Sequence, residues 1–231
     1  MSLLLQIQTV PDSLTNPEIT EKTLSVVDLI TSGGIGGNLV MGALGILSIF
    51  AIYILIERFS AIKKASKEDE NFLKSIQNFV EAKDIEAAKT LCRNTDSPIS
   101  RMIEKGVNRI NKPMTDISAA IENQGKLEVF KMENNLANLA TISGAAPMIG
   151  FLGTVIGMIV AFHEMASAGG NIDVEMLSKG IYTAMTTTVA GLIVGIIAFI
   201  AYNYLVSKVD KVVFMLEAKT TDFLDLLHHN E

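Results

Sequence analysis

Residues 134–163, NNLANLATISGAAPMIGFLGTVIGMIVAFH, decide the fold, because they run for 30 residues without Asp, Glu, Lys or Arg. Two more uncharged stretches, each 28 residues long, lie at 29–56 and 180–207. A helix needs about 20 predominantly apolar residues to cross a hydrocarbon core of roughly 30 Å. Helices buried in a soluble core rarely stay uncharged for so long. The sequence therefore predicts three transmembrane helices.

The distribution of basic residues predicts which way the chain crosses the membrane. Fourteen of its 19 Lys and Arg residues lie between Arg58 and Lys131. By the positive-inside rule this segment and the C-terminus are cytoplasmic, and the N-terminus is on the outside. Residues 57–133 hold 13 acidic residues, so this region has no excess of basic charge with which to bind nucleic acid.

We therefore expect an all-α integral membrane protein with long cytoplasmic helical extensions. The expected segments are an outer N-terminal segment with an amphipathic helix (1–34), first span (35–57), cytoplasmic helical domain (58–133), second span (134–163), short outer loop (164–179), third span (180–207) and cytoplasmic C-terminal helix (208–231). No helix breaker separates Met114 from the second span, which predicts one helix from about Thr115 to Phe162. The third span also lacks a stop signal. Asp84 is a predicted N-cap for the segment 85–92.

The second and third spans each carry one face of small or polar residues at helical spacing. These faces are Pro147, Gly150, Thr154, Gly157 and Ala161, with Gly153 beside them, and Ala184, Thr188, Gly191, Gly195 and Ala198. Small residues let membrane helices approach closely. We expect these two spans to pack tightly on each other or on copies of themselves. The first span is bulkier and is expected to face lipid through Leu39, Leu44, Ile46, Leu47, Ile49, Phe50, Ile54 and Leu55.

Threonines within these faces are the candidate functional residues. Thr154 and Thr188 lie on the faces, and Thr183, Thr186 and Thr187 lie nearby. A single buried threonine commonly bonds the i−4 carbonyl of its own helix. Four hydroxyls within residues 183–188 instead favour a wet, hydroxyl-lined path. The three uncharged stretches hold no Asp or Glu, although proton relays in membranes normally use them. If this chain helps to move protons, a partner must supply the carboxylate.

At these residues the sequence resembles the ExbB/TolQ/MotA proton-channel family. Residues 144–157, GAAPMIGFLGTVIG, resemble the second-span motif APxxGLxGTVxG of ExbB. Residues 180–192, GIYTAMTTTVAGL, followed by Tyr202 and Asn203, resemble its third span, GIxxALxxTxxGLxxxIPAxxxYN. By position, Thr154 and Thr188 match the family's pore-facing threonines. Thr183 stands where many ExbB proteins carry Glu, and the proline of IPA is missing at 197–199, which predicts a less kinked helix.

The resemblance implies a homopentamer in the bacterial inner membrane, with a periplasmic N-terminus and a cytoplasmic C-terminus. It implies an ExbD-like single-span partner that supplies a membrane aspartate. It also implies a TonB-like protein, through which the proton motive force energises outer-membrane transport.

Three alternatives remain open from the sequence. A TolQ-like subunit or a gliding-motor stator has the same core, whereas MotA-type stators have four spans. A non-conducting membrane scaffold needs the same tight faces without a threonine path. The sequence has no CxxC, HExxH or GxxxxGK[ST] motif, so we expect no enzymatic activity, metal or cofactor.

Overall fold

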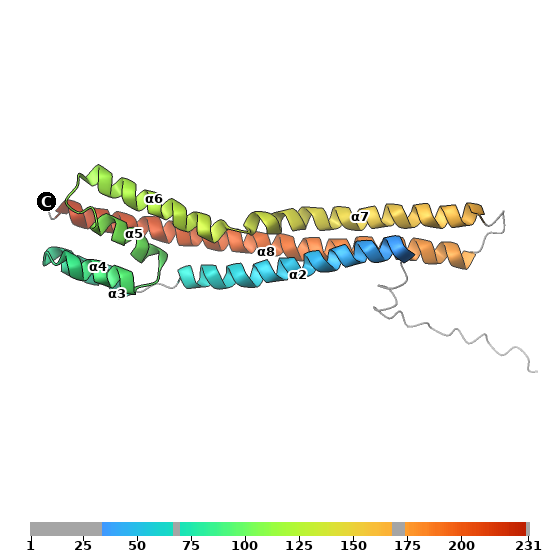
Figure 1. Cartoon of the computed structure of the whole chain (residues 1–231), viewed down its shortest axis with the longest axis horizontal. Helices are drawn as coiled ribbons and strands as arrows, with labels where there is room; N and C mark the ends of the chain where they lie inside the picture. The colour runs from blue at the N-terminus through green and yellow to red at the C-terminus, as the bar shows by residue number, and fades with distance from the viewer. Residues whose placement is uncertain (1–33, 67–69, 168–173, 230–231) are drawn as a thin grey trace, which may run out of the picture.

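The computed structural model describes residues 34–66, 70–167 and 174–229. The amphipathic helix expected within residues 1–34 lies outside the described residues. Three long helices, α2 (Gly34–Ala65), α7 (Leu136–Ser167) and α8 (Val174–His229), run side by side (Figure 1). Each contains a stretch long and apolar enough to cross a membrane. The three predicted spans are thus confirmed as helices of suitable length and composition.

Four shorter helices form a bundle around the C-terminal part of α8 (Figure 1). They are α3 (Glu70–Glu81), α4 (Ile85–Asn94), α5 (Pro98–Val107) and α6 (Met114–Glu133). The carboxylate of Asp84 accepts a hydrogen bond of 3.0 Å from the Ala87 amide, which confirms the predicted cap of α4. Ser97 and Ser100 form a capping box at the start of α5, where Pro98 occupies the first turn.

The single helix predicted from Thr115 to Phe162 is wrong, because the chain breaks at Asn134 and Asn135 between α6 and α7. Asn135 has φ 64°, a left-handed conformation that asparagine tolerates better than most residues. Arg58 of α2 is buried, and its Nη1 donates a 2.9 Å hydrogen bond to the carbonyl of Lys131 in the last turn of α6. In a continuous helix the Lys131 carbonyl would accept a hydrogen bond from a backbone amide one turn later. Here the Arg58 guanidinium replaces that donor.

The third span agrees with its prediction, since α8 continues as one helix of 56 residues. At 1.5 Å per residue it is about 84 Å long, far more than a bilayer core requires. The helices also run past the predicted span limits: α2 continues to Ala65, α7 to Ser167, and α8 begins at Val174. The residues between α7 and α8 are therefore fewer than the predicted 164–179 loop.

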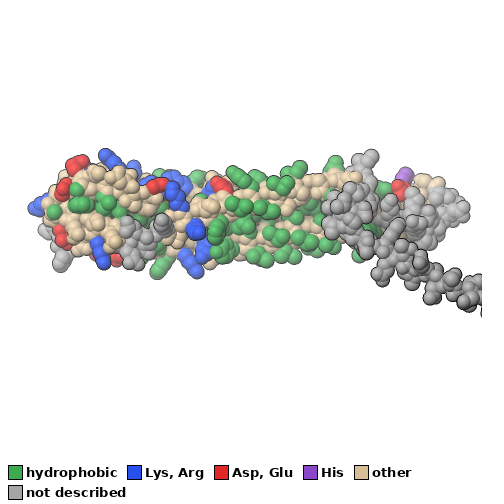
Figure 2. Space-filling view, turned by 90° about the horizontal axis from the view of Figure 1, so that it is seen from below, with side chains coloured by type: hydrophobic (Ala, Val, Ile, Leu, Met, Phe, Trp, Pro, Cys, Tyr) green, Lys and Arg blue, Asp and Glu red, His purple; other side chains and the backbone are tan. Residues whose placement is uncertain are grey.

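The prediction that the bulky side chains of α2 face lipid is only partly correct. Leu44 and Ile54 are fully buried against the other long helices, whereas Leu39, Ile46 and Ile49 are exposed. Helix α2 therefore has one inner face. Hydrophobic side chains cover the surface of the long helices, and charged side chains gather over the bundle (Figure 2).

A buried carboxylate ties the bundle together. Glu128 of α6 is 2% exposed and accepts hydrogen bonds from Arg101 Nη2 at 2.7 Å, Lys131 Nζ at 2.8 Å and Gln124 Nε2 at 2.7 Å. Burial alone would raise the pKa of Glu128, but the bonds from Arg101 and Lys131 outweigh it and lower the pKa. Glu128 therefore stays ionised and links α5 to α6.

Candidate functional site

The closest approach between α7 and α8 lies where Gly150 meets Gly191. A methyl group on Gly150 would lie 2.7 Å from the carbonyl oxygen of Thr187 and 3.1 Å from Gly191 Cα. A methyl group on Gly191 would lie 2.6 Å from the carbonyl oxygen of Ala146. The two backbones are in van der Waals contact here, so any larger side chain would push the helices apart. We call this contact between α7 and α8 the seam.

The other small residues of the predicted faces extend the seam in both directions. A methyl group on Gly195 would lie 2.5 Å from the ring of Pro147, and one on Gly157 would lie 2.9 Å from Ala184 Cβ. Ala161 packs in the same way against Gly180, a pairing that the sequence reading did not single out. The two small faces thus pack against each other within one chain, as one of the two predicted arrangements required.

Thr154 of α7 and Thr188 of α8 lie opposite each other, and their hydroxyl groups are hydrogen-bonded together across the seam. Thr188 Oγ1 is also 3.2 Å from the Gly150 carbonyl, and Thr154 Oγ1 is 3.2 Å from the Ala184 carbonyl. Both side chains are partly exposed. The Gly150 carbonyl, the i−4 acceptor of Thr154, is more distant from its Oγ1 at 3.5 Å. The threonines therefore bond mainly between helices.

This arrangement allows two directions of hydrogen bonding, because each hydroxyl carries one proton. In one, Thr154 donates to Thr188, which donates to the Gly150 carbonyl. In the other, Thr188 donates to Thr154, which donates to the Ala184 carbonyl. A partly exposed hydroxyl pair of this kind can accept a hydrogen bond from a group on one side. When the hydrogen bonds of the pair reverse their direction, a proton is passed to the other side.

Thr183 and Thr187 occupy a different environment, in the junction of α2, α7 and α8. Thr187 is 1% exposed and donates to Ala184 O at 2.7 Å, with Gly150 O at 3.2 Å. A methyl group on Gly153 would lie 2.5 Å from Thr187 Oγ1 and 2.9 Å from Val40 of α2. Thr183 is 8% exposed, and its methyl group faces Gly37 of α2. Of the four threonines, Thr154 and Thr188 are thus partly exposed, and Thr183 and Thr187 are buried.

Helix α2 contributes to this junction in a way that sequence reasoning missed. Gly37 and Val40 are buried, and a methyl group on Gly36 would lie 2.9 Å from Ile156 of α7. The intervals of three and four residues between Gly37, Val40 and Leu44 were the signal for an inner face of α2.

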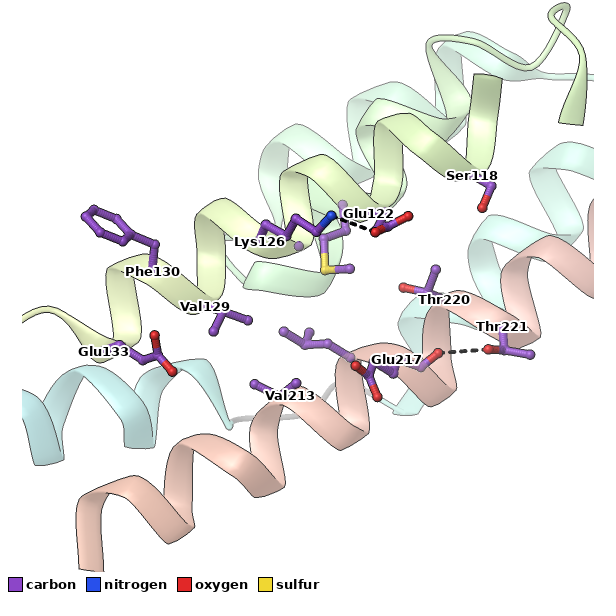
Figure 3. Close-up of a pocket in the computed structure, with 13 residues that line it drawn as sticks. Ser118, Glu122, Lys126, Val129, Phe130, Glu133, Val213, Glu217, Thr220 and Thr221 are labelled. Carbon is purple, nitrogen blue, oxygen red and sulfur yellow. Dashed lines mark hydrogen bonds and ion pairs between the residues drawn. The ribbon is translucent and has the colours of Figure 1, made fainter. Parts of the chain in front are cut away.

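The described residues contain little other chemistry. Among residues 34–66, 70–167 and 174–229, no group of three or more His, Cys, Asp or Glu residues could hold a metal ion. A cavity of about 590 Å³ lies between α6 and α8 in the bundle (Figure 3). There Lys126 pairs with Glu122 at 2.7 Å, and Thr221 donates to the Glu217 carbonyl at 3.0 Å. Cys92 is buried, which raises its thiol pKa to about 12 and leaves it a packing residue.

A family model described as the MotA/TolQ/ExbB proton channel family matches residues 94–218, which include the seam and most of α8. A putative ExbB homolog of Methanothermobacter thermautotrophicus is 26% identical over 194 residues, or 84% of this chain and 67% of that protein.

Two further relatives differ in how much of their length is covered. The biopolymer transport protein ExbB of Helicobacter pylori is 40% identical over 79 residues, which are 34% of this chain and 54% of that protein. The Tol-Pal system protein TolQ of Pseudomonas aeruginosa is 24% identical over 223 residues, or 92% of this chain and 96% of that protein. With more than half of its length matched by the family model, this multi-pass membrane chain belongs to the MotA/TolQ/ExbB proton channel family.

Proposed function

We propose that this chain is the multi-span subunit of a proton-driven motor in the bacterial inner membrane, and that Thr154 and Thr188 line its proton path. Thr183 and Thr187 support this path from the junction with α2. The observation that carries the proposal is the hydroxyl pair across the seam, which is partly exposed and reversible in direction.

The proton path requires a partner. The uncharged stretches of α2, α7 and α8 hold no Asp or Glu, whereas proton relays in membranes need a titrating group. We infer that an ExbD-like single-span protein supplies an aspartate within reach of Thr154 and Thr188. The partner lies on the face of α7 and α8 opposite α2, where both threonines are partly exposed.

The assembly that suits this arrangement is a homopentamer around the partner's helices, with its N-terminus periplasmic and its C-terminus cytoplasmic. The exposed apolar side chains of α7 and α8, such as Phe151 and Val189, supply surface for contacts with neighbouring copies, the partner and lipid. A TonB-like protein would carry the energy to outer-membrane transporters.

The test replaces both hydroxyls with methyl groups in a Thr154→Val, Thr188→Val double variant. Valine keeps the shape of threonine, so the seam should still pack while the hydrogen-bond path is lost. We expect a pentamer that still binds its partner but no longer supports energised import in cells. Thr186→Val is the matched control, because Thr186 donates to Tyr182 O of its own helix at 2.9 Å. Normal import by the double variant would favour the non-conducting scaffold.

A second candidate function is a TolQ-like role in the Tol-Pal system. It is favoured by the match to TolQ over 92% of this chain and 96% of that protein. Co-purification from native membranes distinguishes the two. A TonB-like protein among the captured proteins supports the first role, whereas Tol components keep the proton path and change the task it drives.

A further inference from the structure

An aromatic pair marks the point at which α2 and α8 leave the apolar surface. The rings of Phe59 and Tyr204 stack with their centroids 6.3 Å apart and their planes at 25°. Both side chains remain exposed, Phe59 by 42% and Tyr204 by 46%. Exposed aromatic rings at the end of an apolar segment are typical of the headgroup level of a bilayer.

The lengths of the apolar surfaces agree with this level. Exposed apolar side chains of α2 extend from Leu39 to Phe59, which are 20 residues or about 30 Å apart along the helix. On α8 the main run of them extends from Met185 to Tyr204, about 29 Å apart, and Phe214 is exposed by itself ten residues further on. Each distance matches a hydrocarbon core of roughly 30 Å. The pair therefore lies at the membrane boundary next to the α3–α6 bundle.

Two exposed lysines follow this pair, one turn further along each helix. Lys63 is four residues after Phe59, and Lys208 is four residues after Tyr204, so each lies on the same face as its ring. Lys208 Nζ lies 5.5 Å from the centre of the Tyr204 ring. None of the ion pairs within the described residues involves Lys63 or Lys208.

Three neighbouring charges among the described residues are engaged elsewhere or lie on another face of their helix. Arg58 turns inward to Lys131 O, and Lys64 pairs with Asp96 at 2.6 Å. Asp210 is two residues from Lys208 and therefore on another face of α8. Lys and Arg side chains gather where the hydrophobic surface ends toward the bundle (Figure 2). Two cationic amines on adjacent helices, with no acidic partner among residues 34–66, 70–167 and 174–229, fit a shared anion.

We propose that Lys63 and Lys208 bind the phosphate of an anionic phospholipid, whose acyl chains lie along the exposed apolar side chains of α2 and α8 that precede Phe59 and Tyr204. The lipid belongs to the leaflet next to the α3–α6 bundle. Its phosphate relieves the repulsion between the two amines, and its chains cover the apolar side chains. The site would anchor α2 to α8 at the level where the chain enters the bundle.

The experiment measures lipid binding to the purified full chain by native mass spectrometry from micelles with equal amounts of phosphatidylglycerol and phosphatidylcholine. We expect wild type to retain phosphatidylglycerol preferentially. Lys63→Gln, Lys208→Gln should weaken its apparent affinity for this lipid by about 30-fold, since each lysine near a membrane surface contributes roughly a factor of five. The control is Lys74→Gln, Lys105→Gln, which removes two exposed bundle lysines that are in no ion pair of the described part of the chain, and it keeps the preference.

Equal phosphatidylglycerol retention by the Lys63/Lys208 variant and wild type would overturn the site, as would an equal loss in the control variant. Inorganic phosphate should not compete at concentrations that leave the lipid bound; full competition would indicate a free-phosphate site and overturn the lipid assignment. Circular dichroism on each variant checks that the helices are intact. Should the double variant unfold, raising the salt on wild type must release phosphatidylglycerol and spare phosphatidylcholine, and an unchanged preference would count against the proposal.

Discussion

The seam and the bundle are built from the same α8 helix by opposite means. In the seam, α7 and α8 touch through Gly150 and Gly191 and are joined by threonine hydroxyls. In the bundle, short capped helices surround α8, and the buried charge of Glu128 holds α5 to α6. Lipid gives apolar side chains no reason to leave it, so close backbone approach must hold the seam. Water permits the bundle to use ordinary burial, caps and ion pairs.

The largest effect should come from Gly191→Ala at the closest point of the seam. The new methyl group would lie 2.6 Å from the carbonyl oxygen of Ala146. This backbone atom cannot move aside as the end of a flexible side chain could. Overpacking of this kind costs about 1–3 kcal/mol. We expect a lower midpoint of denaturation in mild detergent, measured by circular dichroism.

Gly144→Ala is the control for this change, because a methyl group at Gly144 of α7 would meet nothing within 4 Å. It should leave the midpoint unchanged or raise it slightly, since alanine favours a helix over glycine. A midpoint for Gly191→Ala as high as that for Gly144→Ala would show that the seam tolerates a methyl group and that the backbone contact is not critical.

An intermediate effect is expected from Glu128→Gln in the bundle. The amide keeps the shape but leaves Arg101 and Lys131 without their charged acceptor, which we expect to cost about 2 kcal/mol at pH 7. The pKa of Glu128 lies below its ordinary value of 4.5, so its stabilisation is present above that value and is lost as the pH falls through the folded-state pKa.

The pH dependence provides the control for this variant. Denaturation of wild type and Glu128→Gln is compared between pH 7 and pH 3. The difference in free energy of unfolding should be constant above about pH 5 and shrink below pH 4.5. Other carboxyls with lowered pKa, such as Glu86 beside Lys89, titrate in both proteins and leave the difference unchanged. A difference independent of pH would contradict the charged role of Glu128.

The smallest effect should come from Asp84→Ala at the start of α4. Removing the carboxylate that accepts from Ala87 should cost about 1 kcal/mol. Asp84→Asn retains an acceptor and should recover most of this loss. Denaturation of both variants checks the order, and no difference between them and wild type would mean that the cap adds nothing to the bundle.

Sequence reasoning worked best where one residue pattern sufficed. The uncharged stretches predicted the long helices, and the 3–4 spacing of small residues predicted the faces that meet at Gly150 and Gly191. Asp84 before an amphipathic segment predicted a cap. Each of these depends on local chemistry or on helical periodicity, both of which are visible within a few turns of sequence.

The features that the sequence did not predict depend on contacts between distant parts of the chain. The break at Asn135 is stabilised by Arg58, more than 70 residues earlier, and nothing around the two asparagines predicted that donor. The sequence also did not predict that Thr187 is buried while Thr188 is partly exposed. Adjacent residues on one helix face different neighbours, and only the position of α2 decides which of the two is buried.

Proton flux through liposomes tests the central claim most directly. The chain is reconstituted alone and together with its single-span partner, as wild type and as Thr154→Val, Thr188→Val, and internal pH is followed after a potential is applied. We predict no flux for the chain alone, flux with the partner, and at least a tenfold loss, roughly 1.4 kcal/mol in barrier height, in the double variant. Undiminished flux in the double variant, or equal flux without a partner, would contradict the account.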